Sequence, residues 1–247
     1  MSVHPDEFII AHTRPGTAPL VPEIQLRLAS AITPIWQATE DWLAQRNIAP
    51  PFWAFAWPGS QALARYVLDH PEAVIGKRVL DFAAGGGLAA IACAMAGAAL
   101  VEAAEIDVLA DAAIRLNAAA NGVSVRIAGD VVGQACRWDL ILCGDVCYEA
   151  PMTGHIVPWL RRLAATAEVW MADPGRSYAP QTGMAPFARC MVPTTLELED
   201  RLVREVTLSR VLPDTTRRMV QRSAGSQMNR SFLVLFFKKE QEESASF

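Results

Sequence analysis

An aspartate and a tyrosine stand three positions apart, immediately after an apolar segment. Asp145 and Tyr148 lie in Gly144–Pro151, GDVCYEAP, which follows the apolar run Trp138–Cys143. Side chains at the carboxyl end of a parallel strand face the edge of the sheet where ligands bind. A carboxylate there can capture and aim a cationic amine, and a tyrosine can hydrogen-bond to that carboxylate or hold the cation on its ring face. The competing interpretation is structural, with Asp145 capping the helix that follows.

Two further carboxylates flank a glycine-rich turn. Asp81 ends the strand in VLDFAAGGGLAA, just before Gly85 and Gly87, and Glu105 ends the next strand about 20 residues on. Glycines let the backbone approach a ligand, and a carboxylate placed like Glu105 can hold both hydroxyls of a ribose. The spacing therefore predicts a nucleoside site. The pattern Gly85-x-Gly87-x-x-Ala90 also matches the glycine pattern of dinucleotide-binding turns. A third explanation is structural, with the glycines present only because the turn packs tightly.

Three features favour S-adenosylmethionine over a dinucleotide as the bound nucleoside. Roughly 75 residues, with an aromatic cluster among them, precede the first strand, whereas a dinucleotide domain usually begins near that strand. Asp81 suits a ligand that carries a positive amino group and would repel a pyrophosphate. The segment IDVLADAAIRLNAAANG, residues 106–122, is similar to the helix that follows the ribose-binding residue in many seven-strand methyltransferases.

The elements that must position these residues alternate in type. Short strands and helices follow one another from residue 77 to residue 173, which predicts a parallel sheet with helices on both faces. We therefore expect an α/β, Rossmann-like, doubly wound sheet of seven strands, mostly parallel, with antiparallel closure supplied by the runs 195–212 and 231–237. A helix over 23–45 is expected in an N-terminal helical extension. The expected organisation is a single domain, 1–247, made of the extension and aromatic segment (1–75), a cofactor-binding core (76–237) and a tail (238–247).

Composition limits the classes of function. The chain has 247 residues, of which 52% are hydrophobic and 19% charged, and its net charge is −4. This describes a globular protein with a large core and argues against binding along a nucleic-acid backbone, while leaving room for a cationic substrate. No secretory signal or membrane-spanning segment is expected. The five cysteines lack metal-binding spacing, so we expect reduced thiols in a cytoplasmic protein and no metal site.

Residues 51–176 resemble the lysine-directed seven-β-strand protein methyltransferases, and within them the electron transfer flavoprotein β-subunit lysine methyltransferases. The matching stretches are WPGSQALARYVLDHPEAVIGKRVLDFAAGGG, EIDVLADAAIRLNAAANG, WDLILCGDVCYE and DPGR, and LVPEI at 20–24 is similar to the start of bacterial members. The resemblance implies methyl transfer from S-adenosylmethionine to a lysine of a protein. It also implies the electron transfer flavoprotein β subunit as substrate, with ribosomal proteins as further substrates of bacterial relatives.

The resemblance assigns residues to the site as well. Asp145 and Tyr148 match the family's Asp-x-x-Tyr motif and are expected to be catalytic. The cofactor-binding residues that it implies are Trp57, Asp81, Ala83, Gly85, Glu105, Ile106, Asp130, Val131 and Gly144. Ala83 departs from the family pattern, in which this position holds the first glycine of the glycine-rich turn. Asp130 is placed for the adenine amino group, although strand ends also carry aspartate for ordinary structural reasons.

Aromatic residues and an arginine complete the expected substrate groove. A lysine amine has a pKa near 10.4 and reacts only when neutral, and burial against Trp53, Phe55 and Trp57 would lower that pKa. Arg176 either lines the groove or belongs to a simple turn. Three rival functions stay open: a small-molecule N-methyltransferase on the same fold, a nucleotide-binding oxidoreductase, and a non-catalytic binding protein that retains the cofactor pocket.

Overall fold

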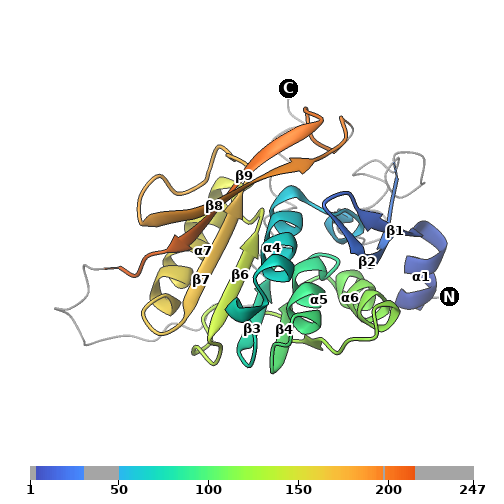
Figure 1. Cartoon of the computed structure of the whole chain (residues 1–247), viewed down its shortest axis with the longest axis horizontal. Coiled ribbons are helices and arrows are strands. Elements are labelled where there is room, and N and C mark those ends of the chain that lie inside the picture. Colours follow the sequence, from blue (N-terminus) through green and yellow to red (C-terminus); the bar gives the residue numbers. More distant parts are fainter. Residues whose placement is uncertain (1–3, 31–49, 197, 215–247) are drawn as a thin grey trace, which may run out of the picture. The chain divides into compact units, whose positions relative to one another are not determined.

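Helices and strands alternate along the chain in the computed structural model, which describes residues 4–30, 50–196 and 198–214, all within the unit 1–214 (Figure 1). The helices are α1 (Pro5–His12), α4 (Pro58–Asp69), α5 (Leu88–Met95), α6 (Val108–Ala120) and α7 (Ala150–Leu163), with 3-10 turns at Phe52–Ala54 and Pro71–Ala73. The strands are β1 (Arg14–Ala18), β2 (Val21–Leu28), β3 (Arg78–Phe82), β4 (Leu100–Ala104), β5 (Arg126–Ile127), β6 (Leu140–Gly144), β7 (Glu168–Asp173), β8 (Met184–Pro193) and β9 (Val203–Val211).

Seven strands form one sheet in the order β5-β4-β3-β6-β7-β9-β8. The strands β3 to β7 pair in parallel, β9 pairs antiparallel with β7, and β8 pairs antiparallel with β9. This confirms the predicted Rossmann-like sheet. From β3 the chain moves outward through β4 and β5, then returns to place β6 on the other side of β3. Ligands of open α/β sheets bind at the carboxyl ends of the strands where such a reversal occurs, here beside Phe82 and Gly144.

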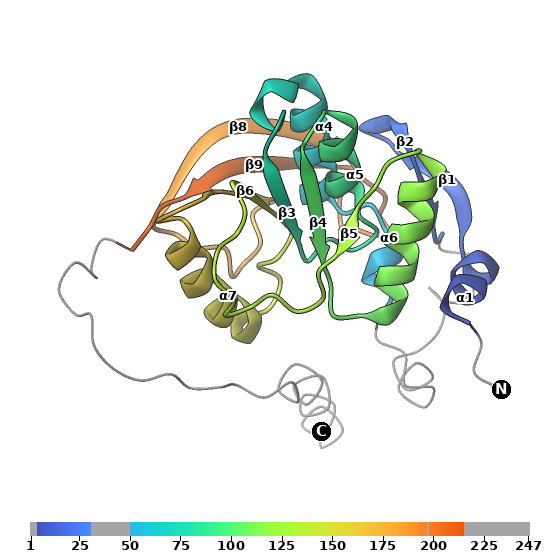
Figure 2. The ribbon, with the colours of Figure 1, turned by 90° about the horizontal axis from the view of Figure 1, so that it is seen from below.

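Alternate residues of each central strand enter separate cores on the two faces of the sheet. Val79 and Leu140 belong to the core that includes α4 and α5, whereas Leu80 and Ile141 belong to the core that includes α7. Figure 2 shows α4 and α5 on one face of the strands and α7 on the other. Because both faces are covered, these strands appear in the sequence as continuous apolar runs.

The N-terminal segment departs from its prediction. Residues 23–28, expected to begin a helix, belong to β2, which pairs antiparallel with β1. Ile24 and Leu26 are buried while Glu23 and Gln25 are exposed, so the side chains follow the two-residue period of a strand. Within the described part of the extension ahead of the aromatic segment, the α-helix is α1. Most of the predicted helix, from residue 31 onward, lies outside the described residues.

The closing strands differ in position from those expected. Of the predicted strand 195–212, only the part from Val203 to Val211 forms β9. Its partner β8 was not predicted, because it is an edge strand whose residues are mostly half-buried or exposed and which contains Pro186 and Pro193. Such a strand lacks a buried apolar face that would show in the sequence. The other expected strand, 231–237, lies outside the described residues.

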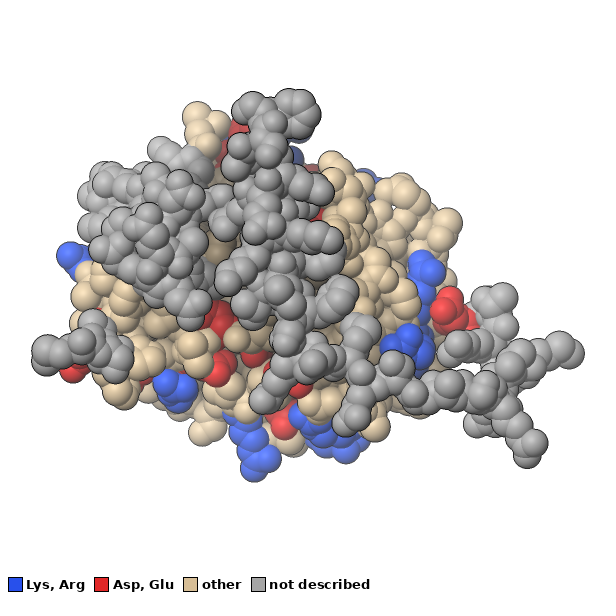
Figure 3. Space-filling model, turned by 180° about the vertical axis from the view of Figure 1, so that it is seen from behind, with Lys and Arg blue, Asp and Glu red and all other residues tan. Residues whose placement is uncertain are grey.

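Charged groups of both signs share the described surface. On the face in Figure 3, basic and acidic side chains alternate along the lower rim. Ion pairs join separate elements, as between Arg78 and Asp139 at 2.7 Å and between Arg137 and Glu102 at 3.0 Å. None of the helices in the described ranges is long and apolar enough to cross a membrane.

Candidate functional site

Two carboxylates meet the glycine turn at the ends of β3 and β4. The side chain of Asp81 is buried and accepts the N–H of Ala90, in the first turn of α5, at 2.9 Å. The carboxylate of Glu105 accepts the N–H of Gly85 at 2.7 Å and that of Ile106 at 3.2 Å. Burial raises the pKa of both carboxyl groups to about 7. The structure therefore brings Glu105 onto the glycine turn, and its role in holding a ribose stays a prediction.

The surroundings of these carboxylates fit a cationic ligand. Burial and backbone hydrogen bonds dominate the pKa values of Asp81 and Glu105, and among the described residues no basic side chain contributes to either. A ligand with positive charge would supply the missing counter-charge, as the sulfonium and ammonium groups of S-adenosylmethionine do. A pyrophosphate would instead add negative charge beside two buried acids. The charge of the site thus favours S-adenosylmethionine over a dinucleotide.

Three residues of the turn between β3 and α5 have a left-handed backbone conformation. Ala83, Gly85 and Gly87 have φ values of 53°, 54° and 81°. Ala83 is exposed, so its methyl group lies on the accessible side of the turn. Gly86 packs so closely on the aromatic segment that a Cβ there would lie 2.8 Å from the carbonyl oxygen of Trp53. The turn therefore has a tightly packed side and an open side, and Ala83 is on the open one.

The other residues of the predicted cofactor set divide into exposed and packed ones. Ile106 is 57% exposed, and Asp130 is also exposed at the end of β5. Val131, in contrast, is fully buried in the core that includes α7. Gly144 faces the start of α4, where a Cβ would lie 2.8 Å from the backbone nitrogen of Ser60. Ile106 and Asp130 are accessible to a ligand, whereas packing alone already accounts for Val131 and Gly144.

The Asp145 carboxylate caps a helix, although not the one that follows it in the chain. Its Oδ2 accepts the N–H of Gly59, in the first turn of α4, at 2.5 Å, and its own N–H donates to the carbonyl of Ala172 at 3.1 Å. The N-cap residue of α4 is Trp57, which makes no side-chain capping hydrogen bond. Asp145 thus caps α4, although it lies 86 residues away in the sequence. The alternative interpretation, that Asp145 caps the following helix α7, is wrong. Burial raises the pKa of Asp145 to about 6.

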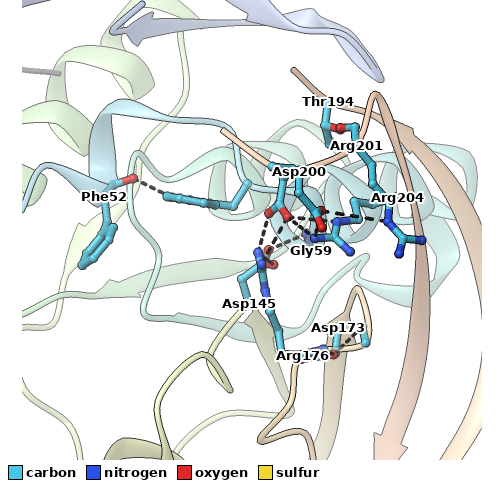
Figure 4. A network of polar contacts seen from close by, with 12 residues as sticks. Phe52, Gly59, Asp145, Asp173, Arg176, Thr194, Asp200, Arg201 and Arg204 are labelled. Carbon is cyan, nitrogen blue, oxygen red and sulfur yellow. Dashed lines mark hydrogen bonds and ion pairs between the residues drawn. The ribbon is translucent and has the colours of Figure 1, made fainter. Parts of the chain in front are cut away.

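Arg176 joins Asp145 to a second buried carboxylate, Glu199. Its Nη2 donates to Asp145 Oδ1 at 3.1 Å and to Glu199 Oε1 at 2.5 Å, and its Nη1 donates to Glu199 Oε2 at 3.2 Å (Figure 4). Arg204 Nε also donates to Glu199 Oε2, at 3.0 Å. The backbone N–H of Arg176 donates to Asp173 Oδ1 at 2.7 Å. A turn after β7 thus directs the guanidinium of Arg176 to Asp145, and its place in a substrate groove stays a prediction.

Aromatic rings stand beside the Asp-x-x-Tyr motif. The ring of Phe52 lies 5.6 Å from that of Tyr148 and 6.0 Å from that of Trp57, between centroids. Trp57 Nε1 donates to the carbonyl of Phe52 at 2.8 Å, which fixes the indole ring (Figure 4). The hydroxyl of Tyr148 donates to the sulfur of Met152 at 3.8 Å and not to Asp145. Tyr148 therefore lies against the ring of Phe52, and its predicted hydrogen bond to Asp145 is absent.

The other aromatic residues of the expected groove lie deeper. Trp53 is 2% exposed and packs with Ile9 and core alanines of α6. Phe55 is half-buried, with its ring 6.1 Å from that of Trp57. Trp53 therefore contributes to the core in this structure and not to a groove. The ring that lies beside Tyr148 is that of Phe52, which the sequence motifs did not indicate.

Three residues of the site have no recognisable sequence signal: Gly59, Glu199 and Arg204. A Cβ on Gly59 would lie 2.5 Å from Asp145 Oδ2, so the close approach of α4 requires a glycine. Its position next to Pro58 suggests only a helix start. Glu199 belongs to the β8–β9 connection and Arg204 to β9, which pairs with β7. Glu199 contacts Arg176, and Arg204 contacts Glu199. Only the tertiary structure reveals these partners.

Comparisons with known proteins relate this chain to methyltransferases. Residues 61–144 match the family described as ribosomal protein L11 methyltransferase (PrmA). The chain is 41% identical over 179 residues to the electron transfer flavoprotein beta subunit lysine methyltransferase of Xenopus laevis, covering 70% of this chain and 71% of that protein. The Homo sapiens protein of the same name is 38% identical over 162 residues, which cover 64% of this chain and 61% of that protein.

Solved structures align with lower similarity. Magnesium protoporphyrin IX methyltransferase from Synechocystis is 18% identical with a TM-score of 0.46, covering 62% of this chain and 83% of that chain. The sequence comparisons are decisive, since the identity to the Xenopus laevis protein extends over more than two thirds of both chains. The chain belongs to the family of electron transfer flavoprotein β-subunit lysine methyltransferases, and it is an S-adenosylmethionine-dependent protein-lysine methyltransferase.

Proposed function

We propose that this enzyme methylates a lysine of the electron transfer flavoprotein β subunit. Relatives named for that activity are 41% and 38% identical to it. The observation that carries the proposal is the environment of Asp145, a buried carboxylate at the point where the strand order reverses, with Tyr148 and Phe52 as aromatic neighbours of the motif. Such a site suits a cationic side chain that must be held and aimed.

The cofactor is expected at the ends of β3 and β4. The oxygens of Glu105 that bind the N–H groups of Gly85 and Ile106 keep lone pairs that can accept the ribose hydroxyls. Asp81 supplies negative charge near the start of α5, and Asp130 is accessible for the adenine amino group. When bound, S-adenosylmethionine supplies the methyl group. The protein's contribution on this side is binding and orientation.

The lysine is expected to arrive on the Asp145 side of the sheet. Asp145 is held in place by the N–H of Gly59, so its carboxylate can aim the amine and stabilise the positive charge that develops on nitrogen. The exposed rings of Tyr148 and Phe52 can wall the channel and attract the cation. Positioning of the amine is thus divided between one charge and two aromatic faces.

Proton removal is the energetic difficulty of the reaction. A free lysine has a pKa near 10.4, so deprotonation at pH 7 costs about 4–5 kcal/mol. Asp145 has a pKa raised to about 6, and it therefore accepts a proton at a lower cost than an ordinary carboxylate. Burial of the amine among aromatic rings lowers the cost further.

Labelled methyl transfer tests the proposal. The enzyme is incubated with radiolabelled S-adenosylmethionine and, separately, with the electron transfer flavoprotein β subunit, a short peptide containing its target lysine, and nicotinamide. We expect the folded protein to be methylated with the highest kcat/KM, because remote contacts supply the positioning. Faster methylation of nicotinamide or another free amine would establish the small-molecule alternative instead.

A ribosomal protein is a second candidate substrate. The match of residues 61–144 to the ribosomal protein L11 methyltransferase family favours it, and this protein belongs in the same assay. Comparable kcat/KM values for the electron transfer flavoprotein β subunit and the ribosomal protein would define an enzyme of broad protein specificity.

We also propose a cytoplasmic location, which the five free cysteines support.

A further inference from the structure

The cation already bound to Asp145 belongs to the protein itself. Arg176 Nη2 lies 3.1 Å from Asp145 Oδ1, at hydrogen-bonding distance from the carboxylate that the proposed function assigns to the substrate's amine. The other oxygen, Oδ2, is occupied by the N–H of Gly59. The side chain of Arg176 is 21% exposed and that of Asp145 is 9% exposed. A substrate amine approaching Oδ1 therefore meets the guanidinium.

Arg176 is held more firmly by its other partner. Two of its nitrogens contact the two oxygens of Glu199, at 2.5 Å and 3.2 Å, whereas only one contacts Asp145. Such two-point pairing of a guanidinium with a carboxylate is the stronger arrangement. The guanidinium can consequently release Asp145 by breaking a single hydrogen bond, while Glu199 continues to hold it.

Glu199 is buried and is held in place by two arginines. Its side chain is 1% exposed, and it accepts hydrogen bonds from Arg204 as well as from Arg176. Its backbone N–H donates to the carbonyl of Thr195 at 2.9 Å, within the β8–β9 connection. Glu199 is therefore fixed beside Arg176 by contacts that do not involve Asp145.

We propose that Arg176 is the resident counter-ion of Asp145, which the substrate's amine displaces, and that Glu199 is the positioning residue that holds the displaced guanidinium. This inference rests on the proposed methylation of an amine at Asp145. Before the substrate binds, Arg176 balances the buried Asp145 carboxylate. When the ammonium arrives, one cation replaces another at Oδ1, so the buried charge stays balanced throughout.

The arrangement makes Arg176 a competitor of the substrate and not a contact for it. Removing Arg176 should therefore help acceptor binding, provided that Asp145 is ionised. Arg176→Gln, assayed at pH 8, is expected to lower the KM for the acceptor at least threefold, with S-adenosylhomocysteine affinity unchanged. A raised KM would show that Arg176 binds the substrate directly and would overturn the proposal.

Removing the charge of Glu199 should have the opposite effect. In Glu199→Gln, Arg176 loses its stronger anionic partner and pairs with Asp145 alone, so the KM for the acceptor should rise at least tenfold, with kcat changing less. Asp200→Asn is the matched control, because Asp200 also pairs with Arg204, at 2.6 Å, but its side chain is 70% exposed and has no contact with Arg176 among the described ion pairs. Its KM should stay within twofold of wild type.

The double variant decides whether Glu199 acts through Arg176. In the Arg176→Gln background, Glu199→Gln should change the KM less than twofold, since there is no guanidinium left to hold. An equal rise in both backgrounds, or an unchanged KM in the single variant, would contradict the positioning role. If Glu199→Gln does not fold, the KM of Arg176→Gln alone still decides between competitor and contact.

The assay uses whichever acceptor the wild-type enzyme methylates. Failure to methylate the electron transfer flavoprotein β subunit would therefore count against the proposed substrate only. The comparison among variants would proceed with the accepted amine, so that the two proposals fail separately.

Discussion

Ala83 and Asp145 are the two non-glycine residues with left-handed backbone in the described part of the chain, with φ values of 53° and 55°. They follow β3 and β6, which are adjacent strands with Phe82 opposite Cys143. Left-handed backbone costs an L-residue about 1–2 kcal/mol, and such strain collects at functional sites. Among the described residues, this strain therefore falls where the glycine turn after β3 and the Asp145 carboxylate after β6 meet the sheet.

Replacing Ala83 by glycine should relieve its part of the strain. Glycine adopts a positive φ freely but loses more entropy on folding, so Ala83→Gly is expected to leave the free energy of unfolding unchanged or raise it by up to about 1 kcal/mol. The exposed methyl group is also removed from the open side of the turn, so S-adenosylhomocysteine should bind at least as tightly. Chemical denaturation and calorimetry provide both values. A clear loss of stability would mean that Ala83 makes favourable contacts that outweigh the strain.

A methyl group on Gly59 should damage the site from the side of α4. The Cβ of Gly59→Ala would lie 2.5 Å from Asp145 Oδ2 and 2.7 Å from the carbonyl oxygen of Ala172. We expect the Asp145 carboxylate to be displaced, kcat to fall at least about tenfold and stability to fall by about 1–3 kcal/mol.

The chain offers a matched control for this substitution. Gly154 lies within α7, and a Cβ there would have no neighbour within 4 Å. Gly154→Ala should therefore leave turnover unchanged and stabilise the protein by up to about 1 kcal/mol. Equal losses of activity in both variants would show that the Gly59 effect is not specific to Asp145.

Cofactor affinity should depend on pH through Glu105. Its pKa is raised to about 7 by burial, and ribose hydroxyls donate to the ionised form. Binding should therefore be tightest above pH 7 and weaken as the pH falls, by up to about tenfold between pH 8 and pH 6. Calorimetry with S-adenosylhomocysteine across this range measures the effect.

Glu105→Gln identifies the group responsible. The amide oxygen still accepts the N–H of Gly85, but the charge is gone, so binding should weaken by about 1–3 kcal/mol and its pH dependence should flatten. The buried Asp81, whose pKa is also raised to about 7, accounts for any slope that remains. An unaltered slope would assign the pH dependence to Asp81. Tight binding of NAD by the wild-type protein would contradict the cofactor assignment itself.

The central sheet could be predicted from sequence because its signals are local. The buried strands β3, β4, β6 and β7 are short, mostly apolar runs with a polar residue or a glycine at or next to the carboxyl end. The spacing from Gly85 to Glu105 follows from one βαβ unit. The strand β2 was missed because its period of two is short and interrupted by Pro22. The edge strand β8 was missed because it buries little.

The partners of Asp145 could not be predicted for a different reason. Gly59 is 86 residues away, and its contact exists only because α4 packs against the ends of β6 and β7. Glu199 follows an edge strand whose register depends on a bulge near Pro186. The motif identifies Asp145 as the candidate catalytic residue, but the groups that contact its carboxylate come from elements far away in sequence.

The measurement that tests the account most directly is the turnover of Asp145→Asn. Asparagine tolerates a left-handed backbone and keeps an oxygen that can accept the N–H of Gly59, so the fold and the cap on α4 should survive. What is lost is the charge that aims the amine. We predict that methylation falls at least ~100-fold, about 2.7 kcal/mol of transition-state stabilisation, while the melting temperature and the S-adenosylhomocysteine affinity stay close to wild type. Near-normal methylation by this variant would contradict the account and leave Asp145 as a structural cap of α4.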